Sequence, residues 1–156
     1  HRGPDAENEY REGELYFRHF RLAIIGNQES AAQPIKSRDG NIVLVFNGEI
    51  YNYKEIAEFM GEAHLAEHGD TRVLVEFLAR YGYKKIDMLN GMFAVVAYNK
   101  KQNSLHLLRD RFGVKPLYYV KDKAALFFSS EIKCFNEVVG PELSSFAIIN
   151  YLDFGA

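Results

Sequence analysis

The sequence predicts a single α+β domain that is rich in antiparallel strands and keeps its helices in one group. Three observations support this class. Strand-like segments come first, two helical segments follow, and strand-like segments then return. No internal repeat, low-complexity tract or linker interrupts the 156 residues, a length that suits one domain with a substantial core. Hydrophobic residues make up 47% and aromatic residues 14%, which is globular composition.

The first strands are expected where aromatic and β-branched residues concentrate. These segments are Leu15–Phe20, Leu22–Ile25 and Asn41–Phe46. Ser37–Gly40 predicts a turn, because Asp-Gly stands there between two extended segments.

Two helices are expected next. Tyr53–Met60 has helical spacing, with Ile56, Phe59 and Met60 on one face. A second helix opens at Gly69–Thr71, where Asp70 or Thr71 is a good N-cap residue. Its apolar residues repeat with helical spacing and Gly82 follows the last of them, which predicts the end of the helix.

The remaining strands are expected in the second half of the chain. They are Met92–Tyr98, Ser104–Arg109, Leu117–Val120 and Ala124–Phe128. A polar turn joins the first two, which predicts a hairpin. Ser130–Phe135 is expected to start a short helix, and Ser144–Phe154 has a helical pattern as well.

Charge and composition exclude several classes of function. The formal net charge of -2 gives no reason to expect nucleic acid or an anionic membrane as a partner. The longest apolar runs are far too short to span a bilayer. The chain has a single cysteine, Cys134, which excludes an internal disulfide and is consistent with the reducing cytoplasm as the location. Cys134 itself is interpreted as a small buried apolar residue. The five histidines show no metal spacing, so no metal site is expected.

The most informative local feature is Asn47-Gly48-Glu49, at the end of an apolar strand. A glycine lets a backbone N–H approach a ligand closely, and an amide side chain beside a free N–H is a usual construction of an oxyanion hole. The alternative is a plain Asn-Gly turn between two strands. The segment that follows, Ile50–Tyr53 and then a helix, does not alternate as a second hairpin strand does, and this weakens the alternative.

Two charged residues allow two interpretations each, and one charged segment allows one. Arg21 lies between strand-like segments, where it pairs either with an internal carboxylate or with the carboxylate of a ligand. Asp70 is either a helix cap or a partner for a cation or amine. The segment Arg109–Tyr119 is interpreted as structural, a turn held by salt bridges with Gly113 and Pro116 fixing its backbone.

Taken in order, these segments resemble the glutaminase domain of glutamine-hydrolysing asparagine synthetases over essentially the whole chain. The segments that carry the resemblance are His1–Asp5, Arg21–Ile24, Phe46–Tyr53, Gly69–Thr71, Leu89–Ala94, Arg109–Tyr119 and Phe128–Lys133. Two of them are highly specific, Asn-Gly-Glu-Ile-Tyr-Asn and Arg-Asp-Arg-Phe-Gly-Val-Lys-Pro-Leu-Tyr. The resemblance implies an N-terminal-nucleophile hydrolase fold, with two stacked antiparallel sheets flanked by helices, and the class II glutamine amidotransferase function.

The resemblance also implies roles for five residues. Arg21 would hold the α-carboxylate of glutamine and Asp70 its α-ammonium, while Glu49 helps to fix the amino-acid end. Asn47 and the N–H of Gly48 would form the oxyanion hole. No cofactor is expected for this domain, whereas a synthetase domain in the parent protein would use ATP and Mg²⁺. The expected partners are L-glutamine and that synthetase domain, and the resemblance is compatible with a homodimer.

The family's nucleophile, an N-terminal cysteine, has no counterpart in these 156 residues. Residues 1–143 are therefore expected to be an amidotransferase domain without its Cys-bearing strand, and residues 144–156 the start of a connection to a synthetase domain. The chain by itself is expected to be inactive, as a truncated part of a competent enzyme. Two alternatives stay open: a non-catalytic binding or regulatory module, and an amidotransferase that serves another acceptor, as in polysaccharide biosynthesis.

Overall fold

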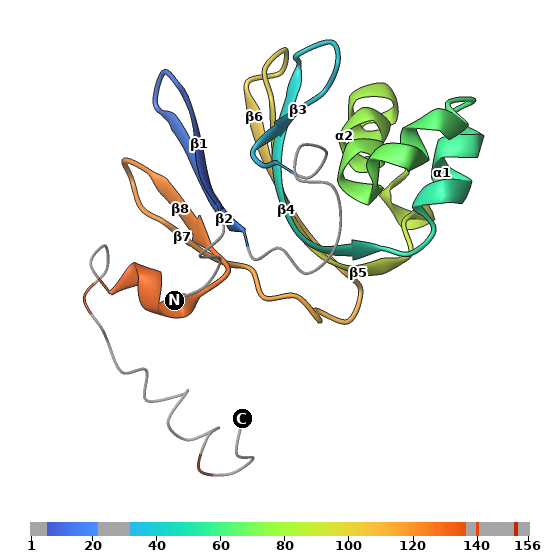
Figure 1. Ribbon diagram of the computed structural model, residues 1–156. Coiled ribbons are helices and arrows are strands. Elements are labelled where there is room, and N and C mark those ends of the chain that lie inside the picture. Colours follow the sequence, from blue (N-terminus) through green and yellow to red (C-terminus); the bar gives the residue numbers. More distant parts are fainter. Residues whose placement is uncertain (1–5, 22–31, 137–139, 141–151, 153–156) are drawn as a thin grey trace. The chain divides into compact units, whose positions relative to one another are not determined.

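The computed structural model describes residues 6–21, 32–136, 140 and 152 (Figure 1). The chain divides into two compact units, residues 1–115 and residues 116–156. The first unit contains the central sheet and both α-helices, and with them all the candidate site residues. The expected strand Leu22–Ile25 lies outside the described residues, as does the expected helix Ser144–Phe154 apart from Leu152.

A four-stranded antiparallel sheet forms the centre of the first unit. Its strands are β3 (Ile35–Lys36), β4 (Ile42–Ile50), β5 (Gly91–Asn99) and β6 (Ser104–Arg109), in the order β3-β4-β5-β6. β5 and β6 form the hairpin that the sequence predicts. Asn47 and Gly48 lie inside β4, paired with Ala94 and Phe93, so the turn interpretation of this dipeptide is wrong. The strand continues to Ile50 because Gly91 and Met92 of β5 remain available for pairing.

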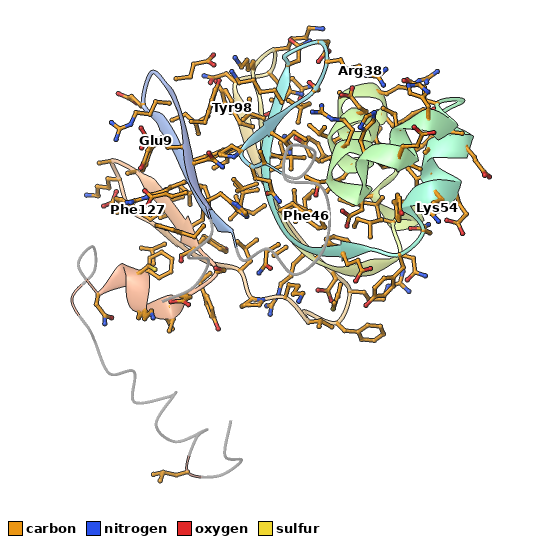
Figure 2. The ribbon with its side chains drawn as sticks, in the orientation of Figure 1. Glu9, Arg38, Phe46, Lys54, Tyr98 and Phe127 are labelled. Atoms are coloured by element: carbon orange, nitrogen blue, oxygen red, sulfur yellow. The ribbon has the colours of Figure 1, made fainter. Side chains whose placement is uncertain are left out.

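Helices cover one face of this sheet (Figure 1). Between β4 and β5 the chain forms α1 (Tyr53–Phe59), η1 (Ala63–His68), α2 (Asp70–Tyr81) and η2 (Ile86–Met88). Alternate β4 residues point toward the helices and are buried there, Phe46 among them (Figure 2). They join a core whose buried members include Ile42, Leu44, Phe46, Ile50, Ile56, Leu65, Val73, Leu74, Phe77, Leu78, Phe93 and Val95.

Both helices occur where the periodicity predicts them, with differences at their ends. Gly69, not Asp70 or Thr71, is the N-cap of α2, because the Asp70 side chain turns toward β4. Gly82 ends the helix in a positive-φ conformation, as predicted. Phe59 does not join the buried face of α1: it is 46% exposed, at the edge of the helix pair, and its ring lies 5.4 Å from that of Tyr81.

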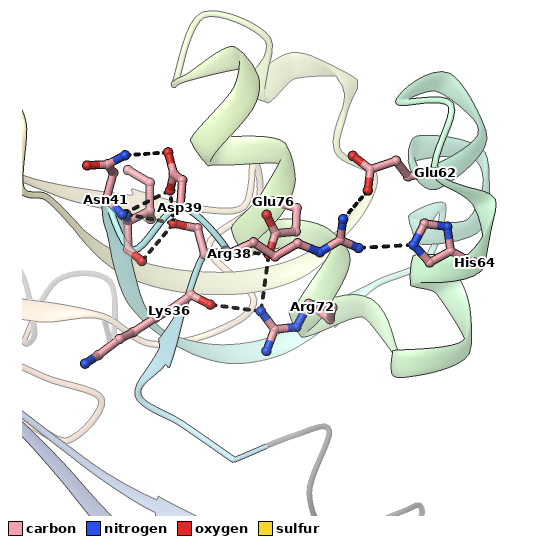
Figure 3. A network of polar contacts seen from close by, with 10 residues as sticks. Lys36, Arg38, Asp39, Asn41, Glu62, His64, Arg72 and Glu76 are labelled. Atoms are coloured by element: carbon pink, nitrogen blue, oxygen red, sulfur yellow. Dashed lines mark hydrogen bonds and ion pairs between the residues drawn. The ribbon is translucent and has the colours of Figure 1, made fainter.

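A polar network ties the turn between β3 and β4 to the helices (Figure 3). The backbone N–H of Arg38 donates to Glu76 of α2 at 3.0 Å, and the Arg38 guanidinium forms an ion pair with Glu62 at 2.5 Å. The Arg72 guanidinium reaches back from α2 to the carbonyl of Lys36 at 2.8 Å. These contacts position α2, and therefore Asp70 at its start, against the sheet.

The expected Ser37–Gly40 turn is confirmed by a hydrogen bond of 2.9 Å from the Gly40 N–H to the Ser37 carbonyl. Asp39 holds it, because its carboxylate accepts from the Ser37 hydroxyl at 2.6 Å and from the Asn41 N–H at 3.0 Å. The hydrogen bonds from Ser37 and Asn41 lower the pKa of Asp39 to about 2.

A separate hairpin precedes the central sheet. It consists of β1 (Ala6–Glu12), which the sequence pattern does not predict, and β2 (Leu15–Arg21). An ion pair of 2.5 Å between Glu12 and Lys100 ties the hairpin to the turn after β5. Arg21, the last residue of β2, pairs with Ala6 across the hairpin.

The second unit contains a two-stranded antiparallel sheet of β7 (Tyr118–Lys121) and β8 (Leu126–Ser129), followed by η3 (Ile132–Phe135). Both strands and the short helix agree with the sequence pattern, and the α+β class with antiparallel sheets is confirmed. The interpretation of Cys134 as a buried residue is wrong. Its side chain is exposed, and the residue that η3 buries is Phe135. No helix in the described part of the chain is long and apolar enough to cross a membrane.

The turn after β6 is held by a buried carboxylate, and the prediction of a salt-bridged turn is wrong. Asp110 is 6% exposed and accepts from the backbone N–H groups of Phe93, Phe112, Val114 and Lys115, at 2.9–3.1 Å. Arg109 donates to the carbonyls of Gly113 and Lys115, at 2.6 and 2.8 Å. Charged side chains therefore satisfy backbone groups here, because the turn has no regular partner strand.

Replacing Asp110 with Asn is expected to lower Tm by on the order of 10 °C, because an amide nitrogen then faces backbone N–H donors. Burial raises the pKa of Asp110, but the four backbone hydrogen bonds outweigh it and hold the pKa below 3.8. Since the folded pKa is depressed, the stabilisation is present above pH 3.8 and is lost as the pH falls through the folded pKa. Circular dichroism melts from pH 7 to 2 check both points, with exposed Asp87→Asn as the control. Equal melting of the two variants would contradict the assignment.

Candidate functional site

The candidate site lies along the open edge of β4. In an antiparallel strand successive N–H groups point to opposite sides. The N–H groups of Phe46 and Ile50 point away from β5: the first donates to the Gln33 side chain at 2.5 Å and the second to Asp70 at 3.0 Å. By this alternation the Gly48 N–H faces the same edge. Among the described strands β3 alone lines that edge, and it pairs only with Val43 and Leu44.

Gly48 is required at this position by its backbone. Its φ is +142°, a conformation that residues with a side chain rarely adopt. A Cβ here would lie 2.0 Å from the Met92 carbonyl oxygen and 2.7 Å from the Phe93 Cα. The close approach of β4 to β5 therefore depends on the missing side chain.

Replacing Gly48 with Ala is expected to lower Tm on the order of 10 °C and to abolish whatever activity this edge supports. The new methyl group would force β4 away from β5 and move the Gly48 N–H. Gly40→Ala is the matched control, because Gly40 also has a positive φ, +70°, but a methyl group added there would meet no atom within 4 Å. If the two variants behave alike, the backbone conformation matters and the close approach does not.

Asn47 and Glu49 present their side chains on the face of β4 opposite to the helices. Phe46 and Ile50 point into the core between the sheet and the helices. Because side chains alternate along a strand, Asn47 and Glu49 lie on the other face, where they are exposed. The amide of Asn47 can donate a hydrogen bond beside the Gly48 N–H, and the Glu49 carboxylate lies two residues further along the same face.

Asp70 joins this edge from the start of α2. One carboxylate oxygen accepts from the Ile50 N–H at 3.0 Å and the other from the Thr71 N–H at 2.7 Å. A carboxylate offers about four acceptor positions, so Asp70 can still accept from an ammonium group. The tertiary structure thus places Asp70 against Ile50, the last residue of the strand that carries Asn47, Gly48 and Glu49, although Asp70 lies up to 23 positions from them in the sequence.

Arg21 is placed only through its backbone, at the end of β2. Its side chain lies outside what the structure describes, and its expected role stays a prediction. Sequence reasoning missed three residues that hold β4 in place: Gln33 at its open edge, and Asn52 and Gly91 on the side of β5. The signal for Asn52 was its place in the Asn-Gly-Glu-Ile-Tyr-Asn motif, whereas Gln33 carries no local signal, because its partner is the N–H of Phe46, 13 residues away.

This edge can serve two opposite charges. A backbone N–H and a primary amide can stabilise a developing oxyanion, and a carboxylate a short distance along the strand can accept an ammonium. An α-amino acid whose side chain carries a carbonyl group presents both.

The fold resembles that of a solved amidotransferase. The solved structure of the glutamine phosphoribosylpyrophosphate amidotransferase of Bacillus subtilis, complexed with ADP and GMP, matches with a TM-score of 0.58. The match covers 76% of this chain and 28% of that one at 22% sequence identity, so the likeness concerns the fold alone.

The family follows from the sequence comparison. The family described as the glutamine amidotransferase domain matches residues 1–156, and the chain belongs to this family. Its curated relatives include asparagine synthetase [glutamine-hydrolyzing] 2 of Bacillus subtilis, 38% identical over 85% of this chain and 18% of that protein. A probable asparagine synthetase of Dictyostelium discoideum is 39% identical over 88% of this chain and 25% of its own length. A putative asparagine synthetase of Methanocaldococcus jannaschii is 41% identical over 78% of this chain. The chain thus spans a quarter or less of these relatives.

Proposed function

We propose that this chain is the glutamine-hydrolysing part of an asparagine synthetase. Glutamine would place its side-chain carbonyl against the Asn47 amide and the Gly48 N–H. Its α-ammonium would bind Asp70, its α-carboxylate Arg21, and Glu49 would help to fix the amino-acid end.

One observation carries the proposal: the hydrogen bond of 3.0 Å from the Ile50 N–H to Asp70. It holds a carboxylate at Ile50, two residues along the strand from Gly48, and this supports a scheme in which an ammonium and an oxyanion would bind along the same strand. The relatives that are named glutamine-hydrolysing asparagine synthetases support the same function.

The chemistry needs groups beyond the four residues of this edge. A cysteine at the mature N-terminus would attack the glutamine side-chain carbonyl, with its own α-amine accepting the thiol proton. Ammonia would leave, and water would hydrolyse the glutamyl thioester to glutamate. A synthetase domain would use the ammonia with aspartate, ATP and Mg²⁺. We further propose a cytoplasmic location, which a single cysteine favours, and assembly as a homodimer, which sedimentation tests directly.

The test is to incubate the full-length protein that carries this chain with aspartate, ATP and Mg²⁺, and to supply either glutamine or ammonia. We expect glutamate and asparagine to form together from glutamine, and asparagine alone to form from ammonia. Glutamate without asparagine would instead indicate an amidotransferase for another acceptor. Glutamine binding without glutamate release would indicate a non-catalytic module. A polypeptide of these 156 residues alone, which begins with His1, is expected to release no glutamate.

A further inference from the structure

The side chain of Asn52 makes two hydrogen bonds that leave its own helix. Asn52 is the N-cap residue of α1, a position where Asn normally accepts from an N–H of the first helical turn. Here it makes no such bond. Its Nδ2 donates instead to the Met88 carbonyl at 2.9 Å, and its Oδ1 accepts from the Asn90 N–H at 2.9 Å. The Asn52 side chain therefore does not cap its own helix, and instead bonds to Met88 and Asn90, which lie 36 and 38 residues away in the sequence.

These contacts hold the segment that leads into β5 against the end of β4. The backbone follows the same pattern, since the Tyr51 N–H donates to the Asn90 carbonyl at 2.8 Å. At the next residue the strands approach so closely that a Cβ on Gly91 would lie 2.2 Å from the Glu49 carbonyl oxygen. The end of β4 is therefore attached through Asn52 to the segment that leads into β5 on one side, and through Asp70 to α2 on the other.

We propose that Asn52 is a positioning residue for glutamine hydrolysis, which holds the end of β4 so that Asn47 and the Gly48 N–H keep their place. This inference rests on the proposed function. Asn52 touches neither the reacting carbonyl nor the amino-acid end in this scheme. It acts through the strand, because a small displacement of an oxyanion donor costs far more in rate than in substrate binding.

The chemistry of the two contacts explains why this residue is an asparagine. Met88 offers a carbonyl and Asn90 an N–H, so the side chain must donate with one atom and accept with the other. Aspartate has the same shape but only accepts, and it would place a negative oxygen against the Met88 carbonyl. Alanine removes both bonds and leaves the two backbone groups without their partner.

The experiment compares Asn52→Ala with Asn99→Ala in the full-length protein. Asn99 lies at the opposite end of β5, and its side chain also donates and accepts, to the Gln102 side chain at 3.4 Å and from the Gln102 N–H at 3.1 Å. For Asn52→Ala we expect kcat for glutamine hydrolysis to fall about tenfold or more, with KM changed less than about threefold. Asparagine formation from free ammonia should stay at the wild-type rate in both variants. Asn99→Ala should leave kcat unchanged.

The melting temperatures of the two variants show whether Asn52→Ala lowers kcat only because the protein is less stable. If both variants lower Tm by similar amounts and only Asn52→Ala lowers kcat, the positioning role is supported. If kcat is unchanged in Asn52→Ala, or falls equally in Asn99→Ala, the proposal is overturned. Should Asn52→Ala fail to fold, Asn52→Asp replaces it, because it keeps the acceptor for Asn90. In that variant a wild-type kcat would likewise overturn the proposal.

Glutamate release by the wild-type protein is measured first, because its result distinguishes failure of the proposed function from failure of the Asn52 proposal. If the wild-type protein releases no glutamate from glutamine, the proposed function fails. If it does, and Asn52→Ala hydrolyses glutamine at the wild-type rate, only the positioning role fails.

Discussion

Replacing Asn47 with Ala in the full-length protein is expected to lower kcat for glutamine hydrolysis roughly a hundred- to a thousandfold, the usual cost of one oxyanion donor. The side chain is exposed on the face of β4 opposite to the helices, beside the Gly48 N–H, so it can be removed without opening the core. KM for glutamine should change little, because the amide acts on the charge that develops during the reaction. Glutamate release at several glutamine concentrations measures both constants.

Two further measurements make this expectation specific. Asn47→Asp keeps the shape of the side chain but puts a negative charge where the oxyanion would form, and its kcat should be lower still. Asparagine formation from ammonia should persist in both variants. An Asn47→Ala protein with wild-type kcat would remove Asn47 from the oxyanion hole.

Replacing Asp70 with Asn is expected to raise KM for glutamine roughly ten- to a hundredfold. The estimate follows from about 1.5–3 kcal/mol for a hydrogen bond to a charged group. Asn retains one oxygen that can accept from the Ile50 N–H, which keeps the strand end attached to α2, while its amide nitrogen faces the Thr71 N–H and the negative charge for the α-ammonium is lost. The kinetics of glutamate release give KM, and a thermal melt shows whether the strand end is disturbed.

Arg21→Ala provides the counterpart at the other end of the amino acid. It should also raise KM for glutamine and leave the ammonia-dependent reaction intact. If Asp70→Asn and Arg21→Ala weaken the glutamine and the ammonia reactions equally, the two residues support the fold and do not bind the substrate.

Local pattern was sufficient for most of the elements. Helical spacing located α1 and α2, and Gly82 marked the end of α2. The polar segment after β5 predicted the hairpin with β6. These features depend on neighbouring residues in the chain, whose preferences are visible in one stretch of sequence. β1 was missed because Ala6–Glu12 is mostly charged and polar, and it forms a strand through its pairing with β2.

The errors occurred where a side chain serves a distant backbone group. Asp70 resembled a helix cap, but its carboxylate takes the N–H of Ile50, 20 residues earlier. Asp110 resembled a member of a salt bridge, but it collects four backbone N–H groups, one of them from Phe93 in β5. Cys134 was judged by its residue type, whereas its exposure depends on which side of η3 packs inward.

The sequence by itself determined the class of fold, the family and the identity of the candidate residues, because motif order and residue chemistry are properties of the chain alone. Only the tertiary structure decided how those residues are used. Asn47-Gly48 became the interior of a strand because β5 pairs with it through Ile50, and the Gly48 N–H faces outward because N–H groups alternate along that strand. Asp70 and Asn52 act at the same strand end from two sides, through hydrogen bonds that span 20 to 38 residues. Long-range pairing of this kind leaves no local periodicity, and for that reason the folded chain alone reveals it.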